Sequence, residues 1–532
     1  MTRINTNVPS LIAQRVLGAN NKALNTSLER LSTGLRINRG ADDPAGLIAS
    51  QNLRAEKAGL ATAIKNAERA DQVVNIAEGG LNEISSLLTD LQSLVTASAN
   101  DAGLSLEEKE ANQLQIDSIL QTIDRVAEAT SFQGTKLLNG TFDYQASSIA
   151  STVNSFKING AKLEFNGQRE VDVITTASAQ KGGFFLSTGG ALNLGGAGAS
   201  DGDDDQFIIE IAGSLGARQL SFASGTAVAD IVSAINSFSD TTGVEATASG
   251  TGFRLDSVEY GESEFVSIKV IDDGSLNTAV AQAGIYNLSA GDTDVLNGTT
   301  AAALFSATAA ENGLTDAGQD VEAFINGVKA TTNGTTARIN TNFLDVEIDL
   351  AYDTGNPSAA VLGKIDAFTI TGGGADFQLA GDVNIAGRVS LGIANVATRE
   401  LGAQTIDVRD ASNPLGAKVA TDFNLSDFQS GASLNAVDGN LDAGQKVIEA
   451  AIREVSSLRG RLGAFQQNTI GATIRSLGVT LENTSAAESS IRDTDFAAET
   501  ASLTRSQVLA QSAQQSLLIA NSNPQSALSL LG

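Results

Sequence analysis

The side chains that most often do chemistry in proteins are missing from this chain. Its 532 residues include no histidine and no cysteine, which excludes thiolate nucleophiles, disulfides, His-ligated metals and imidazole acid–base catalysis. Serine, lysine and carboxylate chemistry remains available, but no motif marks a catalytic site. We therefore expect a protein that is not an enzyme and that holds no cofactor.

An acidic run is the sequence feature closest to a metal site. It comprises Asp201 and Asp203–Asp205. The run lacks the glycine and the terminal glutamate of an EF-hand loop. We interpret it as a solvated loop and assign no metal.

The charge balance narrows the classes of partner. The formal net charge is -27, from 61 acidic and 34 basic residues, and this repels phosphate backbones and anionic lipid surfaces. We expect no nucleic-acid partner and no membrane partner. The first 20 residues hold no apolar run of the signal-peptide kind, and no later segment is apolar enough to span a bilayer. Export would therefore use a route without a cleavable signal peptide.

Aromatic residues divide the chain into three parts. Phe132 is the first, only Phe465 and Phe496 follow residue 430, and all the others lie between Phe132 and Phe428. The alanine-rich, aliphatic ends favour helices, while the middle, rich in phenylalanine, glycine and threonine, favours strands and turns. The sequence predicts an α+β protein, with a long coiled-coil rod from both termini and β-rich surface domains inserted between them.

A narrow apolar seam opens the chain. Leu17, Leu24 and Leu31 recur every seven residues, and Leu28 and Leu35 form a second row. This spacing is typical of a coiled-coil helix. We expect the helix to weaken at Ser32, Thr33 and Gly34.

The next helix begins at an acidic pair followed by proline. Asp43 suits the N-cap position and Pro44 the first helical position. Asp42 adds favourable negative charge at the same helix end. We expect this helix to run to about Ala99, roughly 80 Å at about 1.5 Å per residue, which is the length of a rod. Its two apolar rows are Leu60, Ala67, Val74, Leu81, Leu88 and Val95, and Ala63, Ala70, Ala77, Ile84, Leu91 and Ser98.

A third helix is expected over about 105–129, with a break at Gly103 and a cap at Ser105 before it. The C-terminal end of the chain, from Leu441 onward, repeats the heptad spacing. Beyond Gly471 its seam drifts by one residue, which we expect local bending at Gly471 and Gly478 to absorb. The last helix is expected to end at Pro524. The rows of this half are Leu441, Ile448, Val455 and Leu462; Ala451, Leu458 and Phe465; Ile470, Ile474, Leu477 and Leu481; and Leu503, Leu509, Ala513, Leu517 and Ala520.

Apolar seams at both chain ends need a partner surface, because termini are commonly frayed and polar unless something holds them. The first seam has few large side chains, and each buried leucine contributes only about 1.5 to 3 kcal/mol. Ordering each residue costs about 1 to 2 kcal/mol. We therefore expect the isolated ends to be largely disordered and to fold when other copies of the chain supply the missing surface.

The middle of the chain shows strand and turn patterns. "FKINGAKLEF" (156–165) and "FINGVKATT" (324–332) each carry an Asn-Gly pair that favours a tight hairpin. The stretch from "FIIEIAG" (207–213) to residue 257 predicts two strands, a short helix and two more strands. Glycine-rich residues 182–202 indicate a loop or linker.

Several stretches resemble the bacterial flagellin family. They are "LSTGLRINRGADDPAGLIAS" (31–50), "ADQVVNIAEGGLNEI" (70–84), "IDRVAEATSFQGTKLLNG" (123–140), "SLRGRLGAFQQN" (457–468), "IRDTDFAAET" (491–500) and "NPQSALSLL" (523–531). The resemblance covers both helical ends, and residues 207–257 are similar to a flagellin insertion module.

The resemblance implies a self-assembling subunit of the filament that drives swimming. It divides the chain into an inner-tube helix and spoke (1–43), N-terminal rod helices (44–140), variable outer domains (141–436), a C-terminal rod helix (437–492) and a C-terminal inner-tube helix (493–532). The implied inner-tube packing residues are Leu17, Leu24, Leu28, Leu31, Leu35, Leu503, Leu509 and Leu517. The implied rod packing residues are Leu60, Val74, Leu81, Leu88, Leu91, Val95, Ile448, Val455 and Leu462.

The same resemblance implies partners and a location. It implies a helical homo-oligomer outside the cell, type III export, a chaperone at the C-terminal helix, cap and hook-associated proteins, and O-glycans on the middle domains. It also implies a region read by the animal innate receptor for flagellin, which is altered here at Asp90 and Gln115 while Leu94 is kept. A hook–filament junction protein and a secreted adhesin displayed on coiled coils are the alternatives.

Overall fold

The computed structural model describes residues 6–100, 103–164, 167–194, 206–250, 252–274, 276, 283–288, 303–350, 352–353, 356–360, 362–409 and 418–529. It divides into two compact units: unit 1 holds residues 1–79, 377–389 and 459–532, and unit 2 holds residues 80–376 and 390–458. No helix in the described ranges could cross a membrane, and no group of acidic side chains there could hold a metal ion. The acidic run at 201–205 lies outside those ranges.

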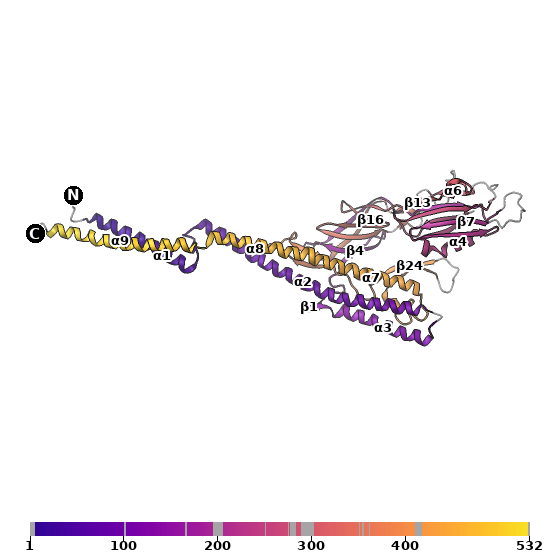
Figure 1. Ribbon diagram of the computed structural model, residues 1–532, viewed down its shortest axis with the longest axis horizontal. Helices are drawn as coiled ribbons and strands as arrows, with labels where there is room; N and C mark the ends of the chain where they lie inside the picture. The colour runs from indigo at the N-terminus through magenta and orange to yellow at the C-terminus, as the bar shows by residue number, and fades with distance from the viewer. Residues whose placement is uncertain are drawn as a thin grey trace. The chain divides into compact units, whose positions relative to one another are not determined.

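Unit 1 is built from helices (Figure 1). The first helix, α1 (Val8–Thr33), ends where Gly34 takes a φ of +72°, a left-handed conformation that glycine adopts without strain. The helix continues through Ser32 and Thr33, and Gly34 is the one of the three expected weak positions at which it ends. The helices that contribute to unit 1 are α1, the first part of α2 (Pro44–Ser98), the end of α7 (Leu441–Ala464) from residue 459, the π-helix η3 (Phe465–Ile470), α8 (Gly471–Arg492) and α9 (Phe496–Ser529).

The long helix α2 confirms the heptad prediction. The carboxylate of Asp43 accepts the backbone N–H of Gly46 at 2.9 Å, as expected of an N-cap. Every residue of the two predicted rows, from Leu60 to Ser98, is buried. Alanines occupy several of these positions, and their small side chains leave room for close packing.

A π-turn absorbs the phase drift in the C-terminal seam, and it lies directly before Gly471. The helix α7 (Leu441–Ala464) passes directly into η3 and then into α8. A π-turn closes its hydrogen bonds over one more residue than an α-turn, so it moves the following side chains one position around the axis. The side-chain amide of Gln466 donates to Asp71 Oδ1 at 2.9 Å and Asn75 Oδ1 at 3.0 Å and so holds this turn on α2.

The last helix, α9, also departs from expectation, because it continues through Pro524 to Ser529. Proline offers no N–H to the carbonyl four residues before it, which usually interrupts a helix. Here that carbonyl, on Ala520, accepts the side-chain N–H of Asn7 at 2.8 Å. The lost backbone hydrogen bond is thereby replaced from α1.

Unit 2 contains the remaining part of α2, the helix α3 (Leu106–Ala129) and the part of α7 up to Leu458. Ser105 and Glu108 form a capping box at the start of α3, which confirms the predicted cap. The chain then returns from the β region as a 3-10 helix, η2 (Leu425–Phe428), whose Leu425 and Phe428 are buried.

Side chains of α3 hold this returning segment. Gln113, only 3% exposed, donates its amide to the carbonyl of Phe428 at 2.7 Å and accepts the N–H of Ala436 at 2.7 Å. Asp124 accepts both the backbone N–H and the hydroxyl of Thr398, at 2.8 and 3.0 Å. These bonds fix the segment that joins the β region to α7.

The first β module has one sheet in the order β15-β14-β5-β21-β3 and another in the order β16-β17-β18-β4, which share a hydrophobic core. Its strands come from two stretches of chain, and Gln180 and Gln319 pair as an antiparallel bridge between those stretches. The strands are β3 (Tyr144–Ser147), β4 (Val153–Ala161), β5 (Arg169–Ala177), β14 (Glu322–Ile325), β15 (Val328–Lys329), β16 (Thr331–Asn333), β17 (Thr336–Asn340), β18 (Leu344–Leu350) and β21 (Gly363–Gly373).

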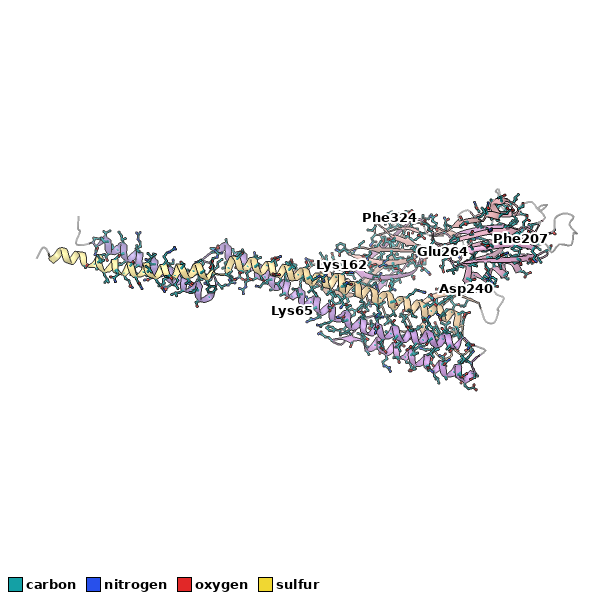
Figure 2. The ribbon with its side chains drawn as sticks, in the orientation of Figure 1. Lys65, Lys162, Phe207, Asp240, Glu264 and Phe324 are labelled. Atoms are coloured by element: carbon teal, nitrogen blue, oxygen red, sulfur yellow. The ribbon has the colours of Figure 1, made fainter. Side chains whose placement is uncertain are left out.

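The second β module is inserted between those two stretches. Its sheets, ordered β12-β6-β10-β9 and β13-β11-β7-β8, enclose a separate core in which the rings of Phe207 and Phe305 meet edge to face (Figure 2 labels Phe207). The elements are β6 (Gly183–Ser187), β7 (Gln206–Gly213), β8 (Ala217–Ala223), α4 (Val228–Asn236), α5 (Ser239–Thr242), β9 (Val244–Ser249), β10 (Gly252–Ser257), β11 (Phe265–Asp272), β12 (Gly284–Asn287), α6 (Thr308–Asn312) and β13 (Leu314–Ala317).

Short strand pairs complete the described elements. They are β1 (Ser131–Phe132) with β2 (Thr135–Lys136), β19 (Tyr352–Asp353) with β20 (Asn356–Ala360), β22 (Ala375–Gln378) with β23 (Arg388–Leu391), and β24 (Gln404–Arg409) with β25 (Lys418–Phe423). The predicted order of two strands, a helix and two strands over 207–257 is confirmed. The motif contributes one hairpin to each sheet of the second module.

The two Asn-Gly pairs behave differently. Asn326 and Gly327 have φ values of +48° and +79° and turn the hairpin between β14 and β15, as predicted. Asn159 and Gly160 do not turn. The strand β4 runs through them with a bulge opposite β18, and Asn159 O accepts the N–H of Gly392 at 2.9 Å. The predicted hairpin there is wrong because this backbone already has partners on both sides.

The glycine-rich stretch 182–202 is only partly a loop. Residues Gly183–Ser187 form β6, a strand inside its sheet with every residue buried. Phe184, Phe185 and Leu186 supply enough apolar surface to outweigh the flanking glycines. Residues 195–202 lie outside the described ranges.

Replacing Gln113 with leucine tests the hold of α3 on the returning segment. The variant leaves the Phe428 carbonyl and the Ala436 N–H without their buried partner, so we expect a destabilisation of about 2 to 4 kcal/mol. The measurement is the urea midpoint of the helical signal at 222 nm. Gln115→Leu, at an exposed position of α3, is the control and should shift the midpoint little. Equal shifts in the two variants would contradict this role of Gln113.

Candidate assembly surface

The first and last helices of the chain lie side by side and antiparallel, so both termini are at the same end of the pair (Figure 1). Polar contacts fix their register along its length. Asn7 Nδ2 donates to Ala520 O at 2.8 Å, and Asn20 Nδ2 donates to Leu509 O at 3.1 Å. Near the other end, Arg30 Nη1 lies 3.7 Å from Glu499 Oε2.

Small side chains fill the seam between α1 and α9. The most buried residues of the pair are Ser10, Ser27, Ser506, Ala510, Ala513 and Ala520. The predicted inner-tube leucines divide into two groups. Leu17, Leu24, Leu31, Leu35, Leu503 and Leu517 are half-buried, whereas Leu28 and Leu509 are exposed. The pair therefore joins its backbones closely and buries little large apolar surface.

Large apolar side chains on the pair remain exposed to solvent outside the seam. Each is between 42% and 63% exposed, and we call this set of residues the terminal apolar face. Exposed apolar groupings of this extent mark interaction sites on soluble proteins. The face comprises Val8, Leu11, Ile12, Val16, Leu28, Phe496, Val508, Leu509, Leu518 and Ile519.

Charge is sparse on this pair, although the chain as a whole is strongly acidic. The helix α1 carries one acidic and three basic residues, and α9 carries one of each. The net charge of -27 therefore resides elsewhere in the sequence. Copies of the pair can approach one another without the repulsion that two acidic surfaces would generate.

Two linkers connect the terminal pair to α2 and α8, and they hydrogen-bond to each other. Arg36 N donates to Arg492 O at 2.7 Å, and Thr494 N donates to Gly34 O at 2.9 Å. Ile37, in the first linker, is 1% exposed and lies against Gly46 of α2, where an added Cβ would be 2.7 Å from Ile37 Cδ1. Sequence reasoning missed Ile37, because a lone apolar residue in a polar linker has no periodicity.

Asp42 has a role in addition to the one predicted. Its Oδ2 accepts the backbone N–H groups of Asn38 and Arg39 at 3.0 and 2.9 Å, so the carboxylate closes the turn before α2. These N–H groups, that of Arg39 first, hold the pKa of the Asp42 carboxyl below its usual range. Arg39 also pairs with Glu29 of α1 at 2.7 Å, and the Glu29 hydrogen bond raises the pKa of the Arg39 guanidinium.

The predicted rod packing positions are all buried. They are Leu60, Val74, Leu81, Leu88, Leu91, Val95, Ile448, Val455 and Leu462, each at most 7% exposed. Glu488 of α8 joins two basic residues of α2, with Lys57 Nζ at 2.8 Å and Arg54 Nε at 3.4 Å. In the region predicted to face the receptor, Asp90 and Gln115 are exposed and Leu94 is half-buried.

Paired terminal helices, a coiled-coil seam and β modules inserted in the middle define a structural protein of the α+β class. Three family models match this chain: the bacterial flagellin N-terminal helical region at residues 4–143, the bacterial flagellin C-terminal helical region at 445–531 and the flagellin hook IN motif at 207–257. Together they cover just over half of it. The chain belongs to the bacterial flagellin family and is a structural subunit of the flagellar filament.

Relatives match over almost the whole length. Flagellin B of Helicobacter pylori is 27% identical over 544 residues, and Flagellin D of Vibrio cholerae is 28% identical over 530 residues, with 99% of each chain covered in both cases. FliC from Burkholderia pseudomallei, a solved structure, is 12% identical over 75% of this chain and 99% of that one, with a TM-score of 0.22. The family models and the full-length flagellin relatives do not favour the alternatives of a hook–filament junction protein or a displayed adhesin.

The turn closed by Asp42 should be sensitive to acid. A carboxyl whose pKa is lowered by folding adds stability above the pKa of an unfolded aspartate, about 3.9, and loses it as the pH falls through the lower folded value. We expect the Asn38 and Arg39 amide resonances of selectively labelled protein to titrate below the midpoint found in a peptide of residues 36–46. Asp42→Asn should abolish this titration. A midpoint at or above that of the peptide would contradict the assignment.

Proposed function

We propose that the chain polymerises through its terminal apolar face and that the partner of this face is a second copy of the same chain. The observation that carries the proposal is the pattern of burial on α1 and α9. Small residues face inward, and ten large apolar side chains between 42% and 63% exposed face outward. Membership in a filament-forming family and the low charge of the pair both favour identical copies as the occupant of this face.

Polymerisation would couple folding to assembly. The seam between α1 and α9 buries mainly serine and alanine, whose burial contributes less than that of larger apolar side chains. Ordering the backbone of both helices costs about 1 to 2 kcal/mol per residue. Neighbouring copies would supply the missing hydrophobic stabilisation by covering Val8, Ile12, Leu518 and the rest of the face. The helices would then become fully ordered only in the filament.

Each of the five segments of the chain would have its own place in the filament. Residues 1–43 and 493–532 would form the inner tube and its spokes, and residues 44–140 and 437–492 would form the rod. Residues 141–436 would form variable outer domains on the filament surface. Burial of the rod rows from Leu60 to Leu462 and the separate cores of the two β modules support this division.

Family membership supports the remaining parts of the proposal. The chain would leave the cell through the flagellar type III route without a cleavable signal peptide, with a chaperone on its C-terminal helix. It would assemble beneath cap and hook-associated proteins and function outside the cell without enzymatic activity. The outer domains would be the place for O-glycans.

Assembly can be tested on the purified full chain by circular dichroism and negative-stain microscopy, before and after seeding or salting-out. We expect filaments with a rise in helicity, and neither from a variant lacking residues 1–40 and 493–532. Ile12→Asp should block filaments by placing a charge in the terminal apolar face. The matched control is Leu215→Asp, at a 67% exposed position between β7 and β8. A monomeric full chain with unchanged helicity would overturn the proposal.

Recognition by the animal innate receptor should be weak. Asp90 and Gln115 stand where the strongly recognised flagellins have arginine and glutamate, and a reversed charge at a contact lowers affinity and association rate. We expect purified monomer to give little response at nanomolar concentration in receptor-reporter cells. The double variant with Asp90→Arg and Gln115→Glu should raise the response. A full response to the unmodified chain would contradict this proposal.

A further inference from the structure

The side chain of Asn7 uses both ends of its amide, one on each terminal helix. Its Oδ1 accepts the backbone N–H of Ser10 at 3.2 Å and caps the start of α1. Its Nδ2 donates to the carbonyl of Ala520 in α9 at 2.8 Å. Asn7 is half-buried, so water competes for these bonds less than at an open surface.

The Ala520 carbonyl that Asn7 contacts differs from most other carbonyls of α9 in its hydrogen bonding. In an α-helix each carbonyl accepts the N–H of the residue four positions later. For Ala520 that residue is Pro524, which has no N–H. Pro524 is the only proline in α9. The Ala520 carbonyl therefore has no N–H donor at the usual position in its own helix, and the donor comes from the beginning of the chain.

A neighbouring contact strengthens this match. Ser10, 8% exposed, donates its hydroxyl to Asn521 Oδ1 at 2.7 Å. Adjacent residues of α9 are thus bound by one turn of α1. Sliding α9 by one residue would place Asn7 against a carbonyl that already has a backbone donor, and would separate Ser10 from Asn521.

We propose that Asn7 and Pro524 form a register-setting clasp between the first and last helices of the chain. Pro524 creates one unsatisfied carbonyl in α9, and Asn7 recognises it, so the two helices gain this bond in only one alignment. The clasp deepens the proposed function, because it rests on the terminal pair that is proposed to order on polymerisation. It would select the correct pairing as the ends fold.

A second asparagine provides an internal comparison. Asn20 Nδ2 donates to the Leu509 carbonyl at 3.1 Å. The residue four positions after Leu509 is Ala513, which has an N–H of its own. This carbonyl is not deprived of a helical donor, so the Asn20 bond adds to an existing one. It should contribute less than the Asn7 bond and should not depend on Pro524.

The experiment is a double-mutant cycle on the full chain, with the critical concentration for seeded polymerisation as the readout. Asn7→Ser keeps a good N-cap but removes the amide donor. We expect it to raise the critical concentration about five- to tenfold, since it leaves a partly buried carbonyl unpaired. Asn20→Ser should raise it about twofold. Pro524→Ala restores the N–H for Ala520, so Asn7→Ser should have little effect in that background.

The outcomes separate the clasp from the proposed function. The clasp is overturned if Asn7→Ser has the same effect with and without Pro524, or has no effect at all. In either case, polymerisation of the unmodified chain still supports the proposed assembly. If the unmodified chain does not polymerise, the proposed assembly fails. Hydrogen exchange of residues 516–529 in the monomer then decides the clasp. Faster exchange in Asn7→Ser only when Pro524 is present supports it, and unchanged exchange overturns it.

Discussion

The contact between α1 and α9 brings together two ends of one chain that are about 500 residues apart in sequence. Serine and alanine in the seam let these helices approach closely, and this leaves the large apolar residues on the outside of the pair. The same distribution gives a seam with little buried large apolar surface and an outer surface with many exposed apolar side chains. The terminal pair is therefore suited to order itself and to bind copies of itself in one process.

Bringing distant ends together is less costly than their separation suggests, because closure entropy grows only with the logarithm of loop length. The chain lowers this cost further by ordering the intervening segment independently. Each β module has its own core, and α3 fixes the returning chain through Gln113 and Asp124. The two linkers then join through Arg36 and Thr494.

Long-range periodicity made the rod predictable from sequence. Heptad rows fix which face of α2 is buried, and the caps at Asp43 and Ser105 follow from local chemistry. The incorrect predictions share a physical cause, because each of the local structures concerned is stabilised by a partner that is distant in sequence. Pro524 is tolerated because of Asn7, and Asn159 stays extended because Gly392 and β18 occupy its backbone. The strand β6 is stabilised by neighbours on both sides. The exposed leucines of the terminal pair show the same limit, because the proposed assembly assigns their packing partners to another chain.

The bridge between Gln180 and Gln319 would allow the second β module to be removed as one unit. Antiparallel bridged residues lie only about 5 Å apart, so the chain enters and leaves this module at almost the same point. Among the residues that the structure describes, the buried core of this module comes from positions 184–310, with none from α2, α3 or α7. A short turn could replace residues 183–317, and a foreign domain with adjacent termini could be grafted at the same junction. The chain could thus display a different inserted domain without any change to the sequence of the rod.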